Sequence, residues 1–188
     1  KALDLADRQV KVRHMNTNRF SGKSILITGG AGGLGSQIAR SVIAQGGKVG
    51  ILDTNEVAIQ SLVTELTANG GKAAGQKVDV RDSKSVTAAV TELAKTLGGI
   101  DVLIAAAGGS LGTPRDLDDI SDEDFELVLD VNVKGTFNCA RAVIPFMKKA
   151  GGGSIVTFSS IGGRSASPVT GVPYATAKAA ILGLTRRL

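Results

Sequence analysis

The sequence predicts an α/β fold in which a doubly wound parallel sheet lies between two layers of helices. From Ser24 onward, short apolar runs suited to buried strands alternate with segments whose apolar residues recur at helical spacing. The first run, 24–28, leads directly into a turn, 29–35, that holds five glycines in seven residues. Alternation of this kind forms right-handed β-α-β units, and strands that are apolar throughout belong to a sheet covered on both faces. We therefore expect a Rossmann-type domain in three layers, α/β/α.

The elements follow one another regularly along the chain. Strands are expected at 24–28, 48–53, 73–80, 101–106 and 154–159, and helices at 36–43, 55–69, 83–97, 121–149 and 174–188. Paired glycines at 70–71 and 98–99 end two of these helices, as glycine past a helix C-terminus often does. Pro145 is expected to interrupt the long helix near its end. The last helix reaches Leu188 with no capping residue or following strand, so we expect the natural chain to continue beyond it.

Composition favours one soluble domain, residues 23–188. The chain has 188 residues, of which 43% are hydrophobic and 21% charged. It contains no apolar run of about 18 residues and no signal-peptide pattern, so no membrane partner is expected. A single cysteine, Cys139, excludes an internal disulfide and fits a cytoplasmic location.

The net charge of +5 comes from the N-terminal segment. Residues 1–23 hold six of the 22 basic and two of the 17 acidic residues, which leaves sixteen and fifteen in the remainder. Aromatic residues make up only 3% of the chain, and no stripe of basic residues with aromatics between them is present. Both observations disfavour nucleic-acid binding. Residues 1–22 are either a native arm that packs on a partner subunit or a segment added for expression before a natural start at Met15. The only histidine, His14, lies there, so no histidine is available in 23–188 as a base, and no metal site is expected.

The glycine-rich turn predicts a site for the phosphates of a dinucleotide. Backbone N–H groups at a helix start are unpaired and carry partial positive charge, and glycines let a pyrophosphate approach them closely. Asp53 ends the second strand, eighteen residues past Gly35, where a carboxylate accepts hydrogen bonds from the adenosine ribose. Its charge would repel a 2′-phosphate, so we expect NAD to be preferred over NADP. The alternative for Asp53 is a solvated cap of the next helix.

Asp79 and Val80 end the third strand, where the adenine should lie. A carboxylate at this position can accept a hydrogen bond from the exocyclic amine of adenine. Aspartate after a strand is also a common turn residue.

Tyr174 and Lys178 carry the clearest signal of chemistry. Positions i and i+4 share one helix face, and a nearby cation lowers the pKa of a phenol from its reference of about 10. Such a phenol can exchange a proton with an alcohol or carbonyl oxygen. Ser160, fourteen residues earlier, could orient the same oxygen. Because residues 23–188 contain no histidine that could activate a serine, a serine hydrolase is disfavoured. Asn132, in an apolar helical segment, is either a structural hydrogen-bonding hub or a link in a proton path.

Together these residues resemble the short-chain dehydrogenase/reductase superfamily, over residues 20–188. Its Thr-Gly-x-x-x-Gly-x-Gly motif is met by Thr28, Gly29, Gly33 and Gly35. Its catalytic tetrad falls on Asn132, Ser160, Tyr174 and Lys178. The cofactor contacts that we expect are Gly29, Gly33, Leu34, Gly35, Asp53, Asp79, Val80, Ala106, Gly108, Tyr174 and Lys178.

The resemblance implies hydride transfer between nicotinamide and a secondary alcohol or ketone. Tyr174 would be the general acid/base, and Lys178 would lower its pKa and bind the nicotinamide ribose. Ser160 would hold the substrate oxygen, and Asn132 would hold a water that links Lys178 to solvent. The family's Asn-Asn-Ala-Gly after the fourth strand is here Ala105-Ala106-Ala107-Gly108. Because Ala106 loses side-chain hydrogen bonds, we expect an effect on stability or cofactor affinity.

The expected function is therefore that of an NAD(H)-dependent oxidoreductase, a short-chain alcohol dehydrogenase or carbonyl reductase acting on a small molecule. The alternatives are a 3-oxoacyl-thioester (acyl carrier protein) reductase, which Asp53 disfavours, and a non-catalytic dinucleotide-binding sensor, which the complete tetrad disfavours. The resemblance also implies a homo-oligomer, a tetramer or dimer, that pairs through the helices around Asn132 and Tyr174.

Overall fold

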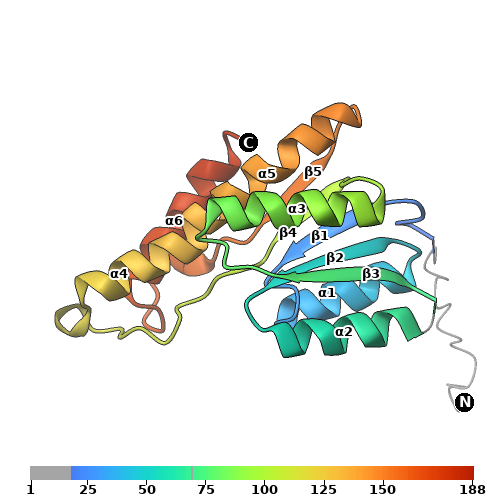
Figure 1. Cartoon of the computed structure of the whole chain (residues 1–188). Helices are drawn as coiled ribbons and strands as arrows, with labels where there is room; N and C mark the ends of the chain where they lie inside the picture. The colour runs from blue at the N-terminus through green and yellow to red at the C-terminus, as the bar shows by residue number, and fades with distance from the viewer. Residues whose placement is uncertain (1–17, 69) are drawn as a thin grey trace, which may run out of the picture.

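The predicted α/β fold is confirmed by a computed structural model that describes residues 18–68 and 70–188 (Figure 1). Five parallel strands form one sheet in the order β3-β2-β1-β4-β5. The strands are β1 Ser24–Thr28, β2 Lys48–Asp53, β3 Lys72–Lys77, β4 Val102–Ala105 and β5 Ser154–Thr157. The order reverses between β1 and β4, the point where open α/β sheets bind ligands.

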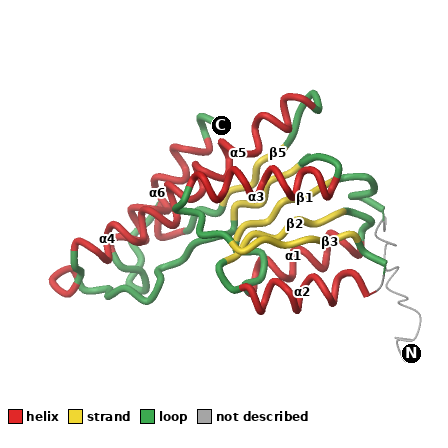
Figure 2. Tube along the Cα trace, viewed as in Figure 1, coloured by secondary structure: helices red, strands yellow, loops and turns green. Residues whose placement is uncertain are grey.

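Helices cover both faces of this sheet (Figures 1 and 2). They are α1 Gly33–Ala44, α2 Glu56–Ala68, α3 Ser83–Leu97, α4 Asp122–Leu129, α5 Gly135–Lys149 and α6 Val172–Thr185. Helices α1 and α2 lie on one face, and α3 and α5 lie on the other. Side chains of β1 alternate between the two layers, since Ile25 and Ile27 pack toward α1 and α2 while Leu26 packs toward α3.

The predicted helix 121–149 is divided into three parts. Helix α4 ends at Leu129, a π-helical turn, η2 Asp130–Lys134, follows, and α5 begins at Gly135. The prediction that Pro145 interrupts the helix was wrong, because Pro145 lies inside α5. Buried side chains on both sides of the proline, Val143 and Met147, hold the helix against the sheet at the cost of one backbone hydrogen bond.

The other boundaries differ by a few residues. Strand β3 ends at Lys77, opposite Asp53 at the end of β2, because no strand remains to pair with residues 78–80. Asp79 and Val80 therefore lie in the loop after the strand. Helix α6 begins at Val172, with Pro173 in its first turn where the missing N–H costs nothing.

The N-terminal segment is described only from Asn18. The remainder of the predicted basic arm, including His14 and Met15, lies outside the described residues. Phe20 packs against the core between α1 and the sheet, and its N–H donates to the carbonyl of Gln45 at 3.0 Å. Within the described ranges, no helix is long and apolar enough to cross a membrane.

Candidate active site and cofactor cleft

The glycine-rich turn between β1 and α1 has the shape that a phosphate requires. Gly29 has φ +61°, and a Cβ there would lie 2.9 Å from Cα of Ala107, so only glycine fits. Helix α1 follows N-cap Gly32, which supplies no side-chain cap, and its first turn carries no acidic residue. The N–H groups at the start of α1 are thus left for an anion, and the turn fits the pyrophosphate of a dinucleotide.

Asp53 joins this turn to the end of β2. Its carboxylate accepts hydrogen bonds from the N–H groups of Ala31 and Asn55, each at 3.1 Å. One oxygen therefore holds the glycine-rich turn and the other holds the start of the next loop. Each oxygen keeps capacity for a further donor such as a ribose hydroxyl.

A cleft of about 310 Å³ opens beside this turn, at the carboxyl ends of the strands. It is lined by Gly29, Leu52, Asp53, Thr54, Val78, Asp79, Val80, Arg81, Ala107, Gly108, Leu111, Leu127 and Val131. Five residues that the sequence predicts for the cofactor therefore share one cleft: Gly29, Asp53, Asp79, Val80 and Gly108. The other six predicted contacts do not line it: Gly33, Leu34, Gly35, Ala106, Tyr174 and Lys178. Leu34 is 56% exposed at the start of α1.

Several cleft residues were missed from the sequence. Leu127 and Val131 reach the cleft from α4 and η2, and apolar residues at helical spacing look like ordinary core positions. Arg81 was missed because its position depends on the turn after β3. The sequence Asp79-Val80-Arg81 places a cation two residues from the carboxylate, which is the one signal that could have revealed it.

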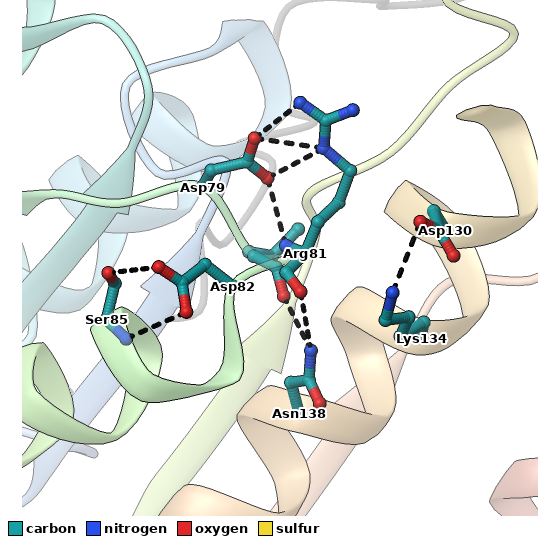
Figure 3. A network of polar contacts seen from close by, with 8 residues as sticks. Asp79, Arg81, Asp82, Ser85, Asp130, Lys134 and Asn138 are labelled. Carbon is teal, nitrogen blue, oxygen red and sulfur yellow. Dashed lines mark hydrogen bonds and ion pairs between the residues drawn. The ribbon is translucent and has the colours of Figure 1, made fainter.

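Asp79 and Arg81 form a hydrogen-bonded ion pair in the loop after β3 (Figure 3). Nε of Arg81 donates to both carboxylate oxygens, at 3.1 and 2.9 Å, and Nη2 donates to Oδ2 at 2.6 Å. The N–H of Arg81 donates to Oδ1 at 2.9 Å. The hydrogen bonds from the Arg81 side chain hold the pKa of Asp79 below its usual value.

Asn132 connects the π-helical turn to the loop after β4. Its amide nitrogen donates to the carbonyls of Gly109 and Val128, both at 2.9 Å, and its oxygen accepts from the N–H of Gly109 at 3.1 Å. Only 1% of Asn132 is exposed, and its side-chain amide is engaged with the backbone. These contacts are those of a structural hydrogen-bonding hub. Its backbone carbonyl accepts a bond from the Thr136 hydroxyl at 2.7 Å.

Gly108 lies between Asn132 and Lys178. Its φ is +145°, and a Cβ there would overlap Oδ1 of Asn132 and lie 3.6 Å from Nζ of Lys178. The three residues therefore converge, although they come from the loop after β4, from η2 and from α6. Because Gly108 also lines the cleft, this convergence adjoins the candidate cofactor site.

Lys178 is a buried cation beside Tyr174. It is 7% exposed, its Nζ donates to the carbonyl of Phe158 at 2.9 Å, and Nζ lies 5.4 Å from the centroid of the Tyr174 ring. Burial lowers the pKa of Lys178 from its usual value. The i and i+4 spacing thus brings ammonium and phenol together as predicted.

Ser160 ends the segment after β5 and caps a short 3-10 helix, η3 Ile161–Gly163. Its Oγ accepts from the N–H of Gly162 at 3.2 Å, and no described residue accepts its proton. The neighbouring Ser159 hydroxyl donates to the carbonyl of Lys178 at 2.7 Å, which ties this segment to α6. No direct hydrogen bond joins Ser160, Tyr174 or Asn132 to one another within the described ranges.

The loop after β4, in which alanines replace the two asparagines of the family motif, is held by backbone hydrogen bonds. The N–H of Ala107 donates to the Thr28 hydroxyl at 3.1 Å, and the N–H of Ala106 donates to the carbonyl of Ile104 at 3.1 Å. Among the described residues, no three His, Cys, Asp or Glu side chains are grouped so as to hold a metal ion.

Known proteins match this chain in sequence and in fold. The profile of the family described as short chain dehydrogenase matches residues 23–188. The 2-dehydro-3-deoxy-L-rhamnonate dehydrogenase (NAD(+)) of Sphingomonas sp. (strain SKA58) is 36% identical over 90% of this chain and 66% of its own length. Oxidoreductase UcpA of Salmonella typhimurium is 40% identical over 90% of this chain and 64% of its own length.

A solved structure of NAD+-bound xylitol dehydrogenase matches with a TM-score of 0.83 at 30% identity, over 90% of this chain and 65% of that one. The chain thus spans about two thirds of the length of each of these relatives.

Proposed function

The chain belongs to the short-chain dehydrogenase family, and from this premise we propose that it is an NAD-dependent oxidoreductase that interconverts a secondary alcohol and a ketone. The observation that carries the proposal is the convergence of Asn132, Gly108 and Lys178, with Tyr174 beside the lysine, at the edge of the cleft. A redox cofactor and a proton-transfer group are the two parts that this reaction needs, and the two sites adjoin.

The glycine-rich turn, the N-terminus of α1 and Asp53 would hold the cofactor. The bound nicotinamide supplies the carbon that accepts or donates hydride. We propose that NAD is preferred over NADP, because the Asp53 carboxylate lines the cleft and would repel a 2′-phosphate. The relative from Sphingomonas is named as an NAD(+) enzyme and the xylitol dehydrogenase was solved with NAD+, which supports this preference.

The proton that accompanies hydride transfer would pass through Tyr174. Its phenol would accept the proton of the alcohol in oxidation and return it to the ketone oxygen in reduction. The Lys178 ammonium lies 5.4 Å from the centroid of the Tyr174 ring. Ser160 keeps a free hydroxyl proton, which would donate to the same substrate oxygen as negative charge develops on it.

The substrate is proposed to be a small polyhydroxylated compound. One relative is named for a deoxy sugar acid and one solved neighbour for xylitol, and both names describe small molecules with several hydroxyl groups. An open cavity of about 610 Å³ beside Ser160, lined by Arg164, Ser165 and Leu182 among others, offers space for such a molecule.

The test is an assay of NADH formation with a panel of sugar acids, polyols and other secondary alcohols. Tyr174→Phe should lower turnover by at least about a hundredfold, the usual range for a lost acid/base, while the Kd for NAD stays within about threefold. Appreciable turnover by this variant would remove Tyr174 from the acid/base role. Measuring the Kd for NADP in the same way as the Kd for NAD tests the role of Asp53. Tighter binding of NADP than of NAD would contradict the proposed preference.

A further inference from the structure

The loop after β3 forms one wall of the cofactor cleft, and its backbone has little support of its own. Asp79, Val80 and Arg81 all line the cleft and belong to no helix or strand. The Asp79 side chain is 37% exposed, and its carboxylate accepts hydrogen bonds from three N–H groups, all of Arg81, which leaves capacity for a further donor. Whether a ligand meets this carboxylate depends on where the loop is held.

The two ends of the loop are fixed by the elements that they join. On one side, the N–H of Val78 donates to the carbonyl of Asp53 at 2.8 Å, which ties the loop to the end of β2. On the other side, the Asp82 side chain caps α3. Neither contact reaches the residues that line the cleft between these ends.

Asn138 of α5 holds the middle of the loop (Figure 3). The residue is 4% exposed, and its Nδ2 donates to the carbonyls of Val80 and Arg81, at 2.9 and 3.4 Å. A single side-chain amide thereby pairs two backbone carbonyls that lie 58 and 57 residues away in sequence. Without that amide the buried carbonyl of Val80 would lose this donor, which is costly in the protein interior.

The orientation of the Asn138 amide is set from its other side. Nη2 of Arg141 donates to Oδ1 of Asn138 at 3.2 Å. An amide oxygen only accepts and an amide nitrogen only donates, so a guanidinium on one side and two carbonyls on the other are satisfied by a single orientation. A Cβ on Gly135 would lie 2.5 Å from Cγ2 of Val80, so the start of α5 also packs closely on the loop.

We propose that Asn138 is a positioning residue for adenine, which acts by holding the backbone of residues 79–81 in the conformation that the adenosine half of NAD binds. Asn138 does not line the cleft and acts only through this loop. The inference rests on the proposed function, because it assumes that the cleft takes NAD. A loop that is ordered before the ligand arrives does not have to be ordered by the ligand, so its anchor contributes to affinity.

Calorimetric titration with NAD, AMP and nicotinamide mononucleotide tests this role. Asn138→Ala should raise the Kd for NAD and for AMP by the same factor, about threefold to thirtyfold, the range of one or two lost hydrogen bonds. The Kd for nicotinamide mononucleotide, which has no adenine, should not change. A general loss of structure would weaken all three ligands.

Two further variants separate positioning from stability. Asn138→Asp keeps the size of the side chain and the contact with Arg141 but places a carboxylate oxygen against two carbonyls, so it should weaken NAD and AMP at least as much as Asn138→Ala. Met147→Ala is the matched control, because it removes a buried side chain nine residues further along α5 that does not line the cleft. It should lower the stability of the fold and leave every Kd unchanged.

Hydrogen exchange of the unliganded chain observes the loop directly. The N–H groups of Arg81 and Asp82 donate to the side chain and the carbonyl of Asp79, at 2.9 and 3.1 Å. Both amides should exchange faster in Asn138→Ala than in the unmodified chain, and Met147→Ala should leave them as they are relative to the other amides.

Four outcomes would overturn the inference alone: an unchanged Kd for NAD and AMP in Asn138→Ala, an equal rise in the Kd for nicotinamide mononucleotide, full affinity in Asn138→Asp, or unchanged exchange of the Arg81 and Asp82 amides. A loss of affinity in Met147→Ala as large as that in Asn138→Ala would also overturn it, since stability would then explain both. Failure of the unmodified chain to bind NAD at all would overturn the proposed function and the inference together.

Discussion

Lys178 places a positive charge in the proposed active site, where burial makes that charge costly for the stability of the fold. The ammonium is almost fully buried, and among the described residues it contacts one carbonyl and the face of Tyr174 and no carboxylate. A buried charge without a counter-ion destabilises the folded state. We therefore expect the lysine to be retained for activity at the expense of stability.

Lys178→Met tests this conflict. Methionine fills a similar volume without the charge, so the free energy of unfolding at pH 7 should rise by about 1 kcal/mol while turnover is lost. Urea denaturation and the NADH assay measure the two effects. A variant that is less stable than the unmodified chain would show that the bond to Phe158 outweighs the cost of burial.

The pH dependence of that difference has a definite sign. Burial lowers the pKa of Lys178 below its usual 10.5, so between the two values the unfolded chain binds a proton that the folded chain does not. Stability therefore rises with pH across this window, and the penalty is complete only below the lowered pKa. The advantage of Lys178→Met should shrink as the pH is raised toward 10.5.

Site residues differed in how well the sequence predicted them. Tyr174 and Lys178 could be paired because helical spacing alone places them on one face, and the observed contact between Lys178 and the ring agrees. The partners of Asn132 could not be predicted, because Gly109 is far from it in sequence and the contact depends on how the loop after β4 returns. Arg81 required the conformation of an irregular turn, which periodicity does not describe.

At the scale of elements, the segment 121–149 shows the limit of periodicity most clearly. Its apolar spacing continues through Asp130–Lys134, so the sequence predicts one helix, yet those residues form a π-helical turn. Such a turn changes the facing of every residue after it, and it places buried Asn132 against the loop after β4. By contrast, α3 has the bounds that the sequence predicts, and in the structure Asp82 caps its start and Gly98 its end.

The cap of α4 offers a test at this scale. Ser121 and Asp124 form a capping box, in which the Ser121 hydroxyl accepts from the N–H of Asp124 at 3.1 Å and Asp124 accepts from the N–H of Ser121 at 3.3 Å. Ser121→Ala should lower the free energy of unfolding by about 1 kcal/mol.

Because α4 carries Leu127 into the cleft, loosening its first turns should also weaken NAD binding modestly. Ser121→Thr keeps the hydroxyl and is the matched control for both measurements. Equal stability of the alanine variant and the unmodified chain in urea would mean that the cap contributes nothing to α4.

At the scale of the whole molecule, the fold could be predicted because few topologies are open to a chain in which strands and helices alternate. Five strands separated by helices form right-handed crossovers, and the helices then cover both faces of the parallel sheet. The carboxyl ends of β1, β2 and β4 thereby meet at one edge, which brings the glycine-rich turn, Asp53 and Gly108 to one cleft. The apolar wall that α4 and η2 add to it depends on side-chain packing and was not predicted.

Assembly of the molecule remains a proposal, and α5 supplies its test. Phe137 is 43% exposed on this helix, and the guanidinium of Arg141 lies 4.8 Å from its ring centroid. Aromatic and arginine side chains are both enriched at the centre of protein interfaces. We therefore expect copies of the chain to associate through α5.

Phe137→Glu should weaken self-association by about tenfold or more, since it places a charge in a contact that must exclude water. Val57→Glu introduces the same charge at another exposed apolar side chain, 80% exposed on α2 in the opposite helix layer, and should leave assembly unchanged. Size-exclusion chromatography with light scattering over a range of concentrations measures both. An unmodified chain that is monomeric throughout, or equal effects of the two substitutions, would exclude α5 as the contact face.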